Sequence, residues 1–448
     1  MKIKKVKWEN HPILGNLELD FWNTSNSTPY DTILFAGENG TGKTTILETI
    51  STFLNRGSFE YFEFIEYIVD GRIYKAVQAN HSTVKDFYNM IDDAGNTTPV
   101  HANKNNNVQL IDSNILDIRH YGCVFSKARA DYKTQKITST TTKILDSEKY
   151  DNDQEDDFTS LKQLIVDIQN QDTSEYAELN ESLGSTPKPW NDFYITSKIY
   201  RFKNAFDTFF DKLKYEKVTN LNSEKAILFR KNNNSISIDK LSTGEKQIVF
   251  RGIYLLKNNK KLNGAAIMVD EPELSMHPKW QKNILKYYQD LFTESGNQKT
   301  QIFLATHSEH VVSQALKDRA KNLVVILNET GGIINAKKIV APSVLPSITS
   351  AETNYLAFDI VSNDYHIELY GWLQRKESKT SVKSCDTYIK QHSLYNASIH
   401  GKSSSNGSTT YETLSTFIRN AIDHPDPSRT FTENELRISI ELLIELCR

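Results

Sequence analysis

The amino-acid sequence predicts an α/β protein whose parallel or mixed sheet is covered by helices, with a small all-helical domain at the C-terminal end. A glycine-rich loop at 37–45 lies between an apolar run and a segment with helical spacing, which is the order strand, loop, helix. Short apolar runs alternate with helical segments over 225–340, a pattern typical of parallel sheets covered on both faces. After about residue 350 the pattern becomes helical.

Length and composition limit the classes of protein that this chain can represent. A chain of 448 residues is long for one core and predicts two or three domains. A formal net charge of −3 excludes a chain that is basic throughout, although a local basic face could still bind nucleic acid. The three cysteines lack metal-site spacing, and no apolar run reaches the ~18 residues of a membrane span. We therefore expect a cytoplasmic protein without membrane contact.

The N-terminal third is predicted to consist mainly of short strands. Alternating or continuous apolar positions predict strands at 2–8, 14–21, 31–36, 61–76 (a hairpin turning at Asp70 and Gly71) and 114–125.

The glycine-rich loop has the pattern G-x-x-x-x-G-K-[ST], which after a strand and before a helix predicts binding of a nucleoside triphosphate. Glycines allow backbone N–H groups to approach phosphate oxygens, and the following helix adds free N–H groups and its dipole. We expect Lys43 to bind the β- and γ-phosphates of ATP and the Thr44 hydroxyl to bind Mg²⁺. The predicted nucleotide-binding residues of this loop are Gly37, Glu38, Asn39, Gly40, Thr41, Gly42, Lys43, Thr44 and Thr45.

The middle of the chain, about 134–222, is predicted to be an insertion made of an acidic loop and helices. Seven of the twelve residues from Asp146 to Asp157 are acidic, and we expect them to form a solvated, mobile loop. Residues 158–217 have helical character with breaks at Gly184, Pro187 and Pro189. No heptad pattern persists there for three repeats, so a long coiled coil is not expected.

Beyond the insertion the α/β pattern resumes up to about residue 340. We expect strands at 226–230, 235–238, 265–269, 301–305 and 323–327, and helices at 244–256, 278–293 and 309–319. The predicted domains are 1–340 and 341–448, and the Ser- and Gly-rich stretch 401–409 is expected to be a loop within the second.

Two carboxylates follow the apolar strand that begins at Ala265. Asp270 and Glu271 are thereby placed at the C-terminal edge of the sheet, where ligands of open α/β sheets bind. We expect Asp270 to hold Mg²⁺, through a water in its shell, and Glu271 to polarise or deprotonate the attacking water.

Two further segments point to the same chemistry. In Leu241–Gln247, Ser242 and Gly244 stand at a helix start and predict a second anion-binding nest. Because the chain has its own phosphate loop, we expect this second nest to bind the nucleotide of a partner protomer. His307 follows the strand that ends at Ala305, where a neutral imidazole can hydrogen-bond the γ-phosphate.

These four segments, in this chain order, resemble the Walker A, signature, Walker B and switch-histidine motifs of ABC-type ATPases, and within them the RecF/SMC-like heads. Residues 270–278, Asp-Glu-Pro-Glu-Leu-Ser-Met-His-Pro, are similar to the D-E-P-E-x-x-L-H-P pattern of AAA_21-like bacterial defence ATPases, with Met276 at the Leu position. The resemblance covers 1–340. It implies a homo-oligomer, at least a head-to-head dimer, in which Ser242 and Gly244 close on the other protomer's γ-phosphate. No residue near 123–133 matches the family's Q-loop glutamine.

The compact layout resembles most closely the Septu-type anti-phage defence ATPases, the PtuA family. Heads of the SMC type have long coiled coils, and the OLD family has a nuclease domain with a D-x-D motif, which residues 341–448 lack. The resemblance implies an ATP-hydrolysing subunit that regulates a separate HNH-type nuclease partner.

Two alternatives remain open from the sequence. Arg419-Asn420-x-x-x-His424 matches the R-N-x-x-x-H motif of HEPN ribonucleases, which would place an RNA-cleaving site in the C-terminal domain; a structural or interface role is the other interpretation. A RecF-like DNA clamp is suggested by the lysines at 2, 4, 5 and 7, although a solvated strand edge is the favoured explanation of these lysines.

Overall fold

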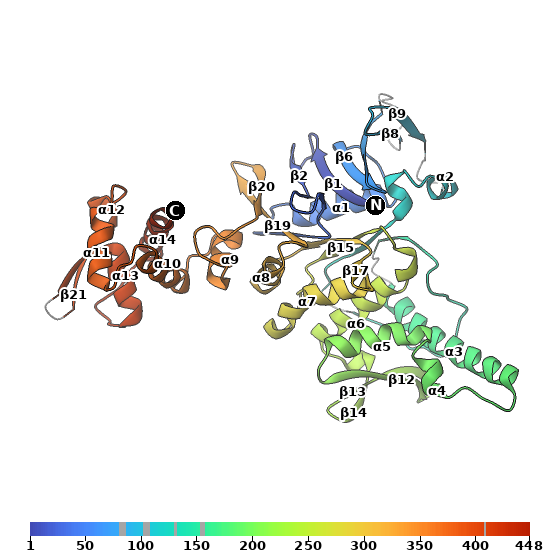
Figure 1. Ribbon diagram of the computed structural model, residues 1–448. Coiled ribbons are helices and arrows are strands. Elements are labelled where there is room, and N and C mark those ends of the chain that lie inside the picture. The colour runs from blue at the N-terminus through green and yellow to red at the C-terminus, as the bar shows by residue number, and fades with distance from the viewer. Residues whose placement is uncertain (80–86, 102–107, 130–131, 153–156, 407–408) are drawn as a thin grey trace. The chain divides into compact units, whose positions relative to one another are not determined.

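The computed structural model describes residues 1–79, 87–101, 108–129, 132–152, 157–406 and 409–448. The chain divides into two compact units, Met1–Lys337 and Lys338–Arg448. Figure 1 colours the first unit from blue to yellow-orange and the second from orange to red.

The central sheet of the first unit has seven strands. Its order is β11-β10-β15-β18-β5-β19-β20. Every pair from β11 to β19 is parallel, as the sequence predicts. The bounds are β5 Thr32–Gly37, β10 Cys123–Ser126, β11 Tyr150–Asn152, β15 Ala266–Asp270, β18 Gln301–Ala305, β19 Asn322–Thr330 and β20 Ile333–Ile339.

Helices cover both faces of this sheet because alternate residues of its buried strands point in opposite directions. Phe35 and Phe303 pack in the cluster that contains the apolar residues of α1 (Lys43–Leu54). On the other face, α8 (Glu309–Lys317) contacts β5 and β19, and α7 (Pro278–Leu291) packs on α8. The predicted α/β fold class is therefore confirmed.

A second sheet lies beside α1 and shares its hydrophobic core. It is antiparallel throughout, in the order β2-β1-β6-β7-β8-β9. Its strands are β1 Lys2–Trp8, β2 Glu18–Asp20, β6 Phe62–Val69, β7 Arg72–Gln78, β8 Phe87–Ile91 and β9 Thr97–His101. A small hairpin, β3 Trp22–Asn23 with β4 Thr28–Pro29, adjoins β1.

The lysines of β1 do not form a free basic face. Each is paired with a carboxylate: Lys2 with Asp31, Lys4 with Glu66, Lys5 with Glu18 and Lys7 with Glu63.

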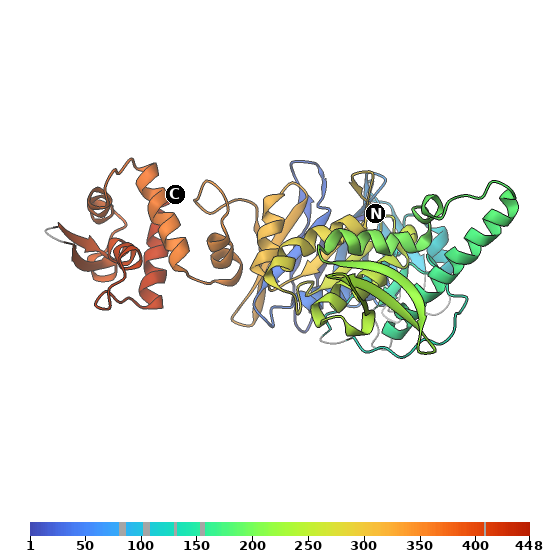
Figure 2. The ribbon, with the colours of Figure 1, turned by 90° about the horizontal axis from the view of Figure 1, so that it is seen from below.

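The insertion contains the predicted helices together with a third sheet. The helices are α3 Asp157–Leu183, α4 Trp190–Tyr194 and α5 Lys198–Phe209, and the distal half of α3 extends away from the sheets (Figure 2). An antiparallel sheet follows, made of β12 Leu213–Leu221, β13 Glu224–Lys231 and β14 Asn234–Ser237. The prediction of helix up to residue 217 is wrong, because alternating Leu213 and Tyr215 are buried under α5 as strand residues.

Two other predictions in this part of the chain are corrected. Only Cys123–Ser126 of the expected strand 114–125 is extended, since α2 (Val108–Ser113) and a short 3₁₀ turn at Ile118–Tyr121 precede it. The acidic stretch is anchored rather than wholly solvated: Asp146 pairs with Arg201, and Asp151 pairs with Lys257 beside β11. Residues 153–156 of that stretch lie outside the described residues.

The helix that bears the second predicted nest, α6 (Thr243–Leu256), packs on β10 and α7. The remaining short elements of the first unit are 3₁₀ turns at Ile238–Lys240 and Asn259–Lys261, and the hairpin β16 Thr293–Glu294 with β17 Asn297–Gln298.

The C-terminal unit is mostly helical and has its own hydrophobic core. Its helices are α9 Ser350–Phe358, α10 Asn363–Lys376, α11 Val382–Gln391, α12 Ala397–His400, α13 Leu414–Asp423 and α14 Glu433–Cys447. The stretch 401–409, expected to be a loop, instead begins a hairpin of β21 Gly401–Asn406 and β22 Thr409–Thr413. The unit is therefore not all-helical. The hairpin forms despite its small polar residues. The buried Asp386 carboxylate holds the end of β22 by accepting hydrogen bonds from the backbone N–H groups of Glu412 and Thr413.

Candidate functional site

Strand register brings three of the four predicted segments to one edge of the central sheet. Ala305 at the end of β18 lies opposite Asp270 of β15 on one side and Phe35 of β5 on the other. The phosphate loop, the two carboxylates and the turn with His307 therefore all begin at the C-terminal edge, the edge at which α/β sheets bind ligands.

Backbone geometry explains the glycines of the loop. Gly37, Gly40 and Gly42 have positive φ angles of 139°, 84° and 81°. A Cβ at Gly37 would lie 2.3 Å from the carbonyl oxygen of Leu327, so only glycine permits this approach of β5 to β19. Gly42 is the N-cap of α1, and Glu38, Asn39 and Gly40 are exposed at the loop tip.

Lys43 lies inside the curve of the loop. Its side chain is buried, and Nζ donates hydrogen bonds to the carbonyl oxygens of Gly37 at 2.9 Å and Glu38 at 2.6 Å. Burial lowers the pKa of the Lys43 ammonium to about 8, against the opposing effect of the nearby carboxylates. The Thr41 hydroxyl closes the loop by donating to the Glu38 carbonyl oxygen at 2.8 Å.

Thr44 and Asp270, 226 residues apart, meet beneath the loop. Thr44 Oγ1 lies 3.1 Å from both carboxylate oxygens of Asp270, which is 7% exposed. Burial raises the pKa of Asp270, whereas the Thr44 hydrogen bond lowers it. Hydroxyl and carboxylate oxygens are the hard donors that Mg²⁺ prefers, so this pair fits a magnesium ion shared with phosphates.

Glu271 and His307 face each other across β15 and β18. His307 Nε2 lies 3.9 Å from Glu271 Oε1, and the Glu271 backbone N–H donates to the Ala305 carbonyl oxygen at 2.9 Å. Glu271 has a left-handed φ of 42°, which is uncommon for a non-glycine residue. Burial, followed by the Lys43 charge, lowers the pKa of His307, so its imidazole is neutral at pH 7.

Ser242 and Gly244 occupy different environments at the start of α6. Ser242 is exposed and forms a capping box with Glu245, whose carboxylate also binds Lys231 at 2.6 Å. Gly244 is buried in its own chain: a Cβ there would lie 2.6 Å from the carbonyl oxygen of Ser275. The structure thus gives Gly244 an intramolecular packing role that the sequence did not suggest.

Arg251 is a central residue that sequence reasoning missed. It is 2% exposed, and it donates to the Glu271 carbonyl oxygen at 2.9 Å and to the Asp270 carbonyl oxygen. It also donates to Ser126 Oγ and O, both at 3.0 Å, and to the Lys127 carbonyl oxygen at 3.1 Å. The sequence does contain one signal for this role. Arg251 is the only charged residue in the run 247–256, and a cation buried on such a helix requires hydrogen-bond acceptors.

A cavity of about 490 Å³ adjoins the phosphate loop. Its walls include Ile13 and Ile333, which are 51% and 66% exposed. Two other lining residues, Leu14 and Ile334, lie against Gly42 of the loop: a Cβ on Gly42 would lie 2.6 Å from Leu14 and 3.1 Å from Ile334. The cavity therefore lies where a nucleoside attached to loop-bound phosphates could pack between aliphatic side chains.

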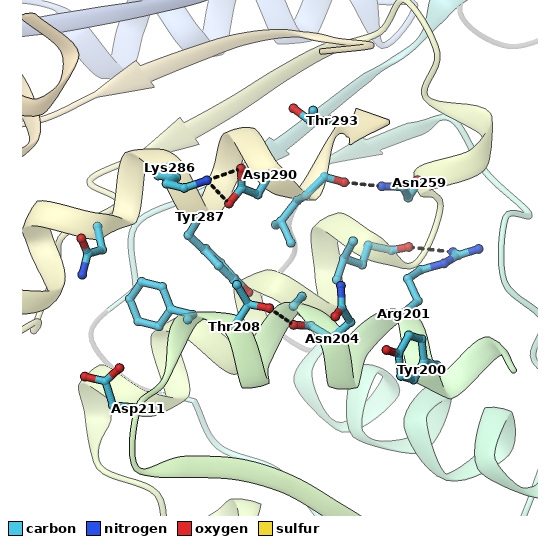
Figure 3. A pocket seen from close by; sticks show the side chains of 15 residues that line it. Tyr200, Arg201, Asn204, Thr208, Asp211, Asn259, Lys286, Tyr287, Asp290 and Thr293 are labelled. Carbon is cyan, nitrogen blue, oxygen red and sulfur yellow. Dashed lines mark hydrogen bonds and ion pairs between the residues drawn. The ribbon is translucent and has the colours of Figure 1, made fainter. Parts of the chain in front are cut away.

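A larger hollow of about 600 Å³ lies elsewhere in the first unit, between α5 and α7 (Figure 3). Its lining includes Tyr200, Asn204 and Tyr287, with the Lys286–Asp290 ion pair at one side. None of the predicted site residues lines it, so it is separate from the phosphate loop.

The residues of the ribonuclease alternative lie on α13 in the C-terminal unit. The Arg419 guanidinium is held by Asp423 at 2.6 Å and by Asn420 Oδ1 at 3.0 Å, while His424 is the C-cap of the helix. Both contacts of Arg419 lie within α13 itself.

Comparisons with known proteins find similarity over parts of this chain. A family model described as an AAA ATPase domain matches residues 120–312. The chain is 29% identical over 167 residues to the retron Ec83 probable ATPase of Escherichia coli. It is 33% identical over 108 residues to the retron Vc95 probable ATPase of Vibrio cholerae serotype O1 biovar El Tor. The aligned parts are 34% and 22% of this chain, and only 29% and 19% of those relatives' own lengths.

Two solved structures of similar fold are heads of SMC proteins. One, bound to the C-winged helix domain of ScpA, has a TM-score of 0.42 at 12% identity and covers 76% of this chain and 98% of its own. The other, from Thermotoga maritima, has a TM-score of 0.38 at 14% identity, with coverage of 76% and 99%.

The phosphate loop at the C-terminal edge of an α/β sheet and the match of residues 120–312 define the class: the chain has the fold and the domain of an ATPase. Within that class it is similar to the probable ATPases of retrons. In the residues that the structure describes, no helix is long and apolar enough to cross a membrane.

Proposed function

We propose that this protein is the ATP-hydrolysing subunit of an anti-phage defence system and that two protomers enclose ATP between them. The observation that carries the proposal is the convergence of Lys43, Thr44, Asp270, Glu271 and His307 at one sheet edge. The similarity to retron probable ATPases supports the defence role.

In this proposal each residue has a defined task. Lys43 would leave the carbonyl oxygens of its loop for the β- and γ-phosphates, and Thr44 with Asp270 would hold Mg²⁺, which would neutralise phosphate charge. Glu271 orients the attacking water and accepts its proton. The neutral His307 donates a hydrogen bond to the γ-phosphate oxygens. The nucleoside occupies the cavity beside Ile13 and Ile333.

The second protomer completes the site through the start of α6. Ser242 and Thr243 are exposed there, and the Lys231–Glu245 ion pair neutralises the carboxylate that would otherwise repel phosphate. The separate nuclease partner of the proposal, of the HNH type, would respond to this ATP-dependent assembly.

The oligomeric state of Glu271→Gln tests the proposal. With ATP and Mg²⁺ this variant should be trapped as a dimer or larger oligomer in light scattering after size exclusion, because it binds ATP without hydrolysing it. Glu329→Gln, which changes an exposed carboxylate of β19, is the matched control and should behave as wild type. A Glu271→Gln protein with the same mass with and without ATP would refute ATP-dependent assembly.

A further inference from the structure

The turn that carries His307 is fastened to the segment after β15 by two side chains. Glu273 Oε1 accepts a hydrogen bond from the His307 backbone N–H at 2.7 Å. Gln281, in the first turns of α7, accepts from Ser308 Oγ at 2.6 Å and donates to the Met276 carbonyl oxygen at 2.9 Å. The carboxylate segment and the histidine turn are thus joined by side-chain bonds in addition to sheet pairing.

Glu273 is an unusual choice for a purely structural tie. It is 9% exposed, and its second carboxylate oxygen, Oε2, has no hydrogen-bond partner among the described residues. A buried carboxylate with an unsatisfied oxygen is unfavourable. Burial also raises the pKa of Glu273, and the His307 N–H opposes that rise. An apolar residue at position 273 would avoid the cost of burying a carboxylate, but it would leave the His307 N–H without its acceptor.

The hydrogen bond of Glu273 is made to His307, the residue whose side chain is proposed to contact the γ-phosphate. The hydrogen bond from the His307 backbone N–H to Glu273 fixes the position of the His307 backbone and therefore of its side chain. The imidazole Nε2 lies 3.9 Å from Glu271 Oε1. Displacing a catalytic group by about 1 Å can reduce turnover about 100-fold.

We propose that Glu273 is a positioning residue for hydrolysis, which holds His307 in register with Glu271 by accepting the His307 backbone N–H. It does not touch the nucleotide and acts through His307. This inference rests on the proposed roles of Glu271 and His307 in ATP hydrolysis.

A double-mutant cycle tests the inference with Glu273→Ala, His307→Ala and the double variant in the full chain. Glu273→Ala should lower kcat about tenfold or more with KM for ATP changed less than about twofold, because ground-state binding is untouched. In the double variant kcat should equal that of His307→Ala, since a residue that acts through His307 has no effect once the imidazole is gone. If Glu273→Ala lowers kcat by the same factor in the wild-type and His307→Ala proteins, the inference is overturned.

Glu273→Gln supplies the conservative comparison. The amide oxygen still accepts the His307 N–H, so kcat should stay within about threefold of wild type. If Glu273→Gln loses as much activity as Glu273→Ala, the carboxylate has another role and the inference fails.

A measurement that does not depend on activity keeps the test decisive. Hydrogen exchange of the peptide 301–312 should be faster in Glu273→Ala and unchanged in Glu273→Gln; equal protection in all three proteins would contradict the tie. Failure of the proposed function has a different signature, in which wild type and Glu271→Gln hydrolyse ATP equally while the exchange result still holds.

Discussion

Replacing Arg251 by methionine should be the most destabilising single change near the site. The guanidinium bridges α6, the end of β10 and the carboxylate segment through five hydrogen bonds to Ser126, Lys127, Asp270 and Glu271. Methionine keeps an unbranched apolar side chain and removes every donor.

The magnitude follows from what the substitution leaves behind. A hydrogen bond from a charged donor contributes about 1.5–3 kcal/mol, but five such values do not add, because removing the cation also relieves its desolvation. Removing the guanidinium leaves several buried carbonyl oxygens without a donor, at about 1–3 kcal/mol each, which together amount to about 3–5 kcal/mol. We expect Arg251→Met to lower the free energy of unfolding of the first unit by that amount, a large part of the about 5–15 kcal/mol typical of domains.

Hydrogen exchange measures this loss within each unit. At about 1.4 kcal/mol per factor of ten, peptides from β15 and α6 should exchange between about 100-fold and several thousand-fold faster in Arg251→Met. Peptides from the C-terminal unit are the internal control and should not change. Lys246→Met, on the same helix but only half-buried, is the matched variant and should shift exchange less than threefold, about 0.6 kcal/mol. Exchange of β15 within threefold of wild type in Arg251→Met would refute the bridging role.

Three further predictions concern the metal, the start of α6 and the C-terminal unit. Asp270→Asn should raise the Mg²⁺ concentration needed for half-maximal ATP hydrolysis about tenfold or more, because it removes a charged oxygen next to Thr44. Gly244→Ala should cost about 1–3 kcal/mol in thermal or urea unfolding, since its Cβ would lie 2.6 Å from a backbone carbonyl oxygen; Gly371→Ala, with nothing within 4 Å, is the control and should not destabilise. The C-terminal unit should lose about 2 kcal/mol between pH 7 and pH 5 through His366, whose pKa burial lowers from 6.5 to about 3.

The sign of the His366 effect follows from proton binding. Below pH 6.5 the unfolded chain protonates this histidine and the folded chain does not, so stability is full above pH 6.5 and falls toward about pH 3. His366→Gln should flatten that slope in exchange of α10 and α14; identical slopes would contradict it. An unchanged Mg²⁺ requirement in Asp270→Asn, or equal effects of the two glycine substitutions, would contradict the other two predictions.

The sequence predicted the central sheet because its strands are continuous apolar runs, each followed by a helix. Phosphate-loop spacing and strand ends also predicted which residues would meet: Thr44 lies against Asp270, and Glu271 lies near His307. The roles assigned to these residues and to Ser242 and Gly244 stay predictions until they are measured.

The features that the sequence did not predict depend on contacts between segments that are distant in sequence. The sequence predicts helix up to residue 217, within β12, because the alternation of polar and apolar residues there is weak. Pairing with β13 stabilises the segment as a strand instead. The acidic stretch is predicted to be mobile because its partners are more than fifty residues away in sequence: Arg201 lies on α5, and Lys257 is the C-cap of α6. Arg251 and Glu273 showed only as charged residues among apolar neighbours, and their partners became visible only in the fold.

The central claim is that one sheet edge, built by the phosphate loop and the segment after β15, hydrolyses ATP. Steady-state phosphate release by wild type and Glu271→Gln, with binding of a fluorescent ATP analogue to both, tests it most directly. Glu271→Gln should bind the analogue as wild type does but hydrolyse ATP at least about 100-fold more slowly. Equal hydrolysis by the two proteins would contradict it.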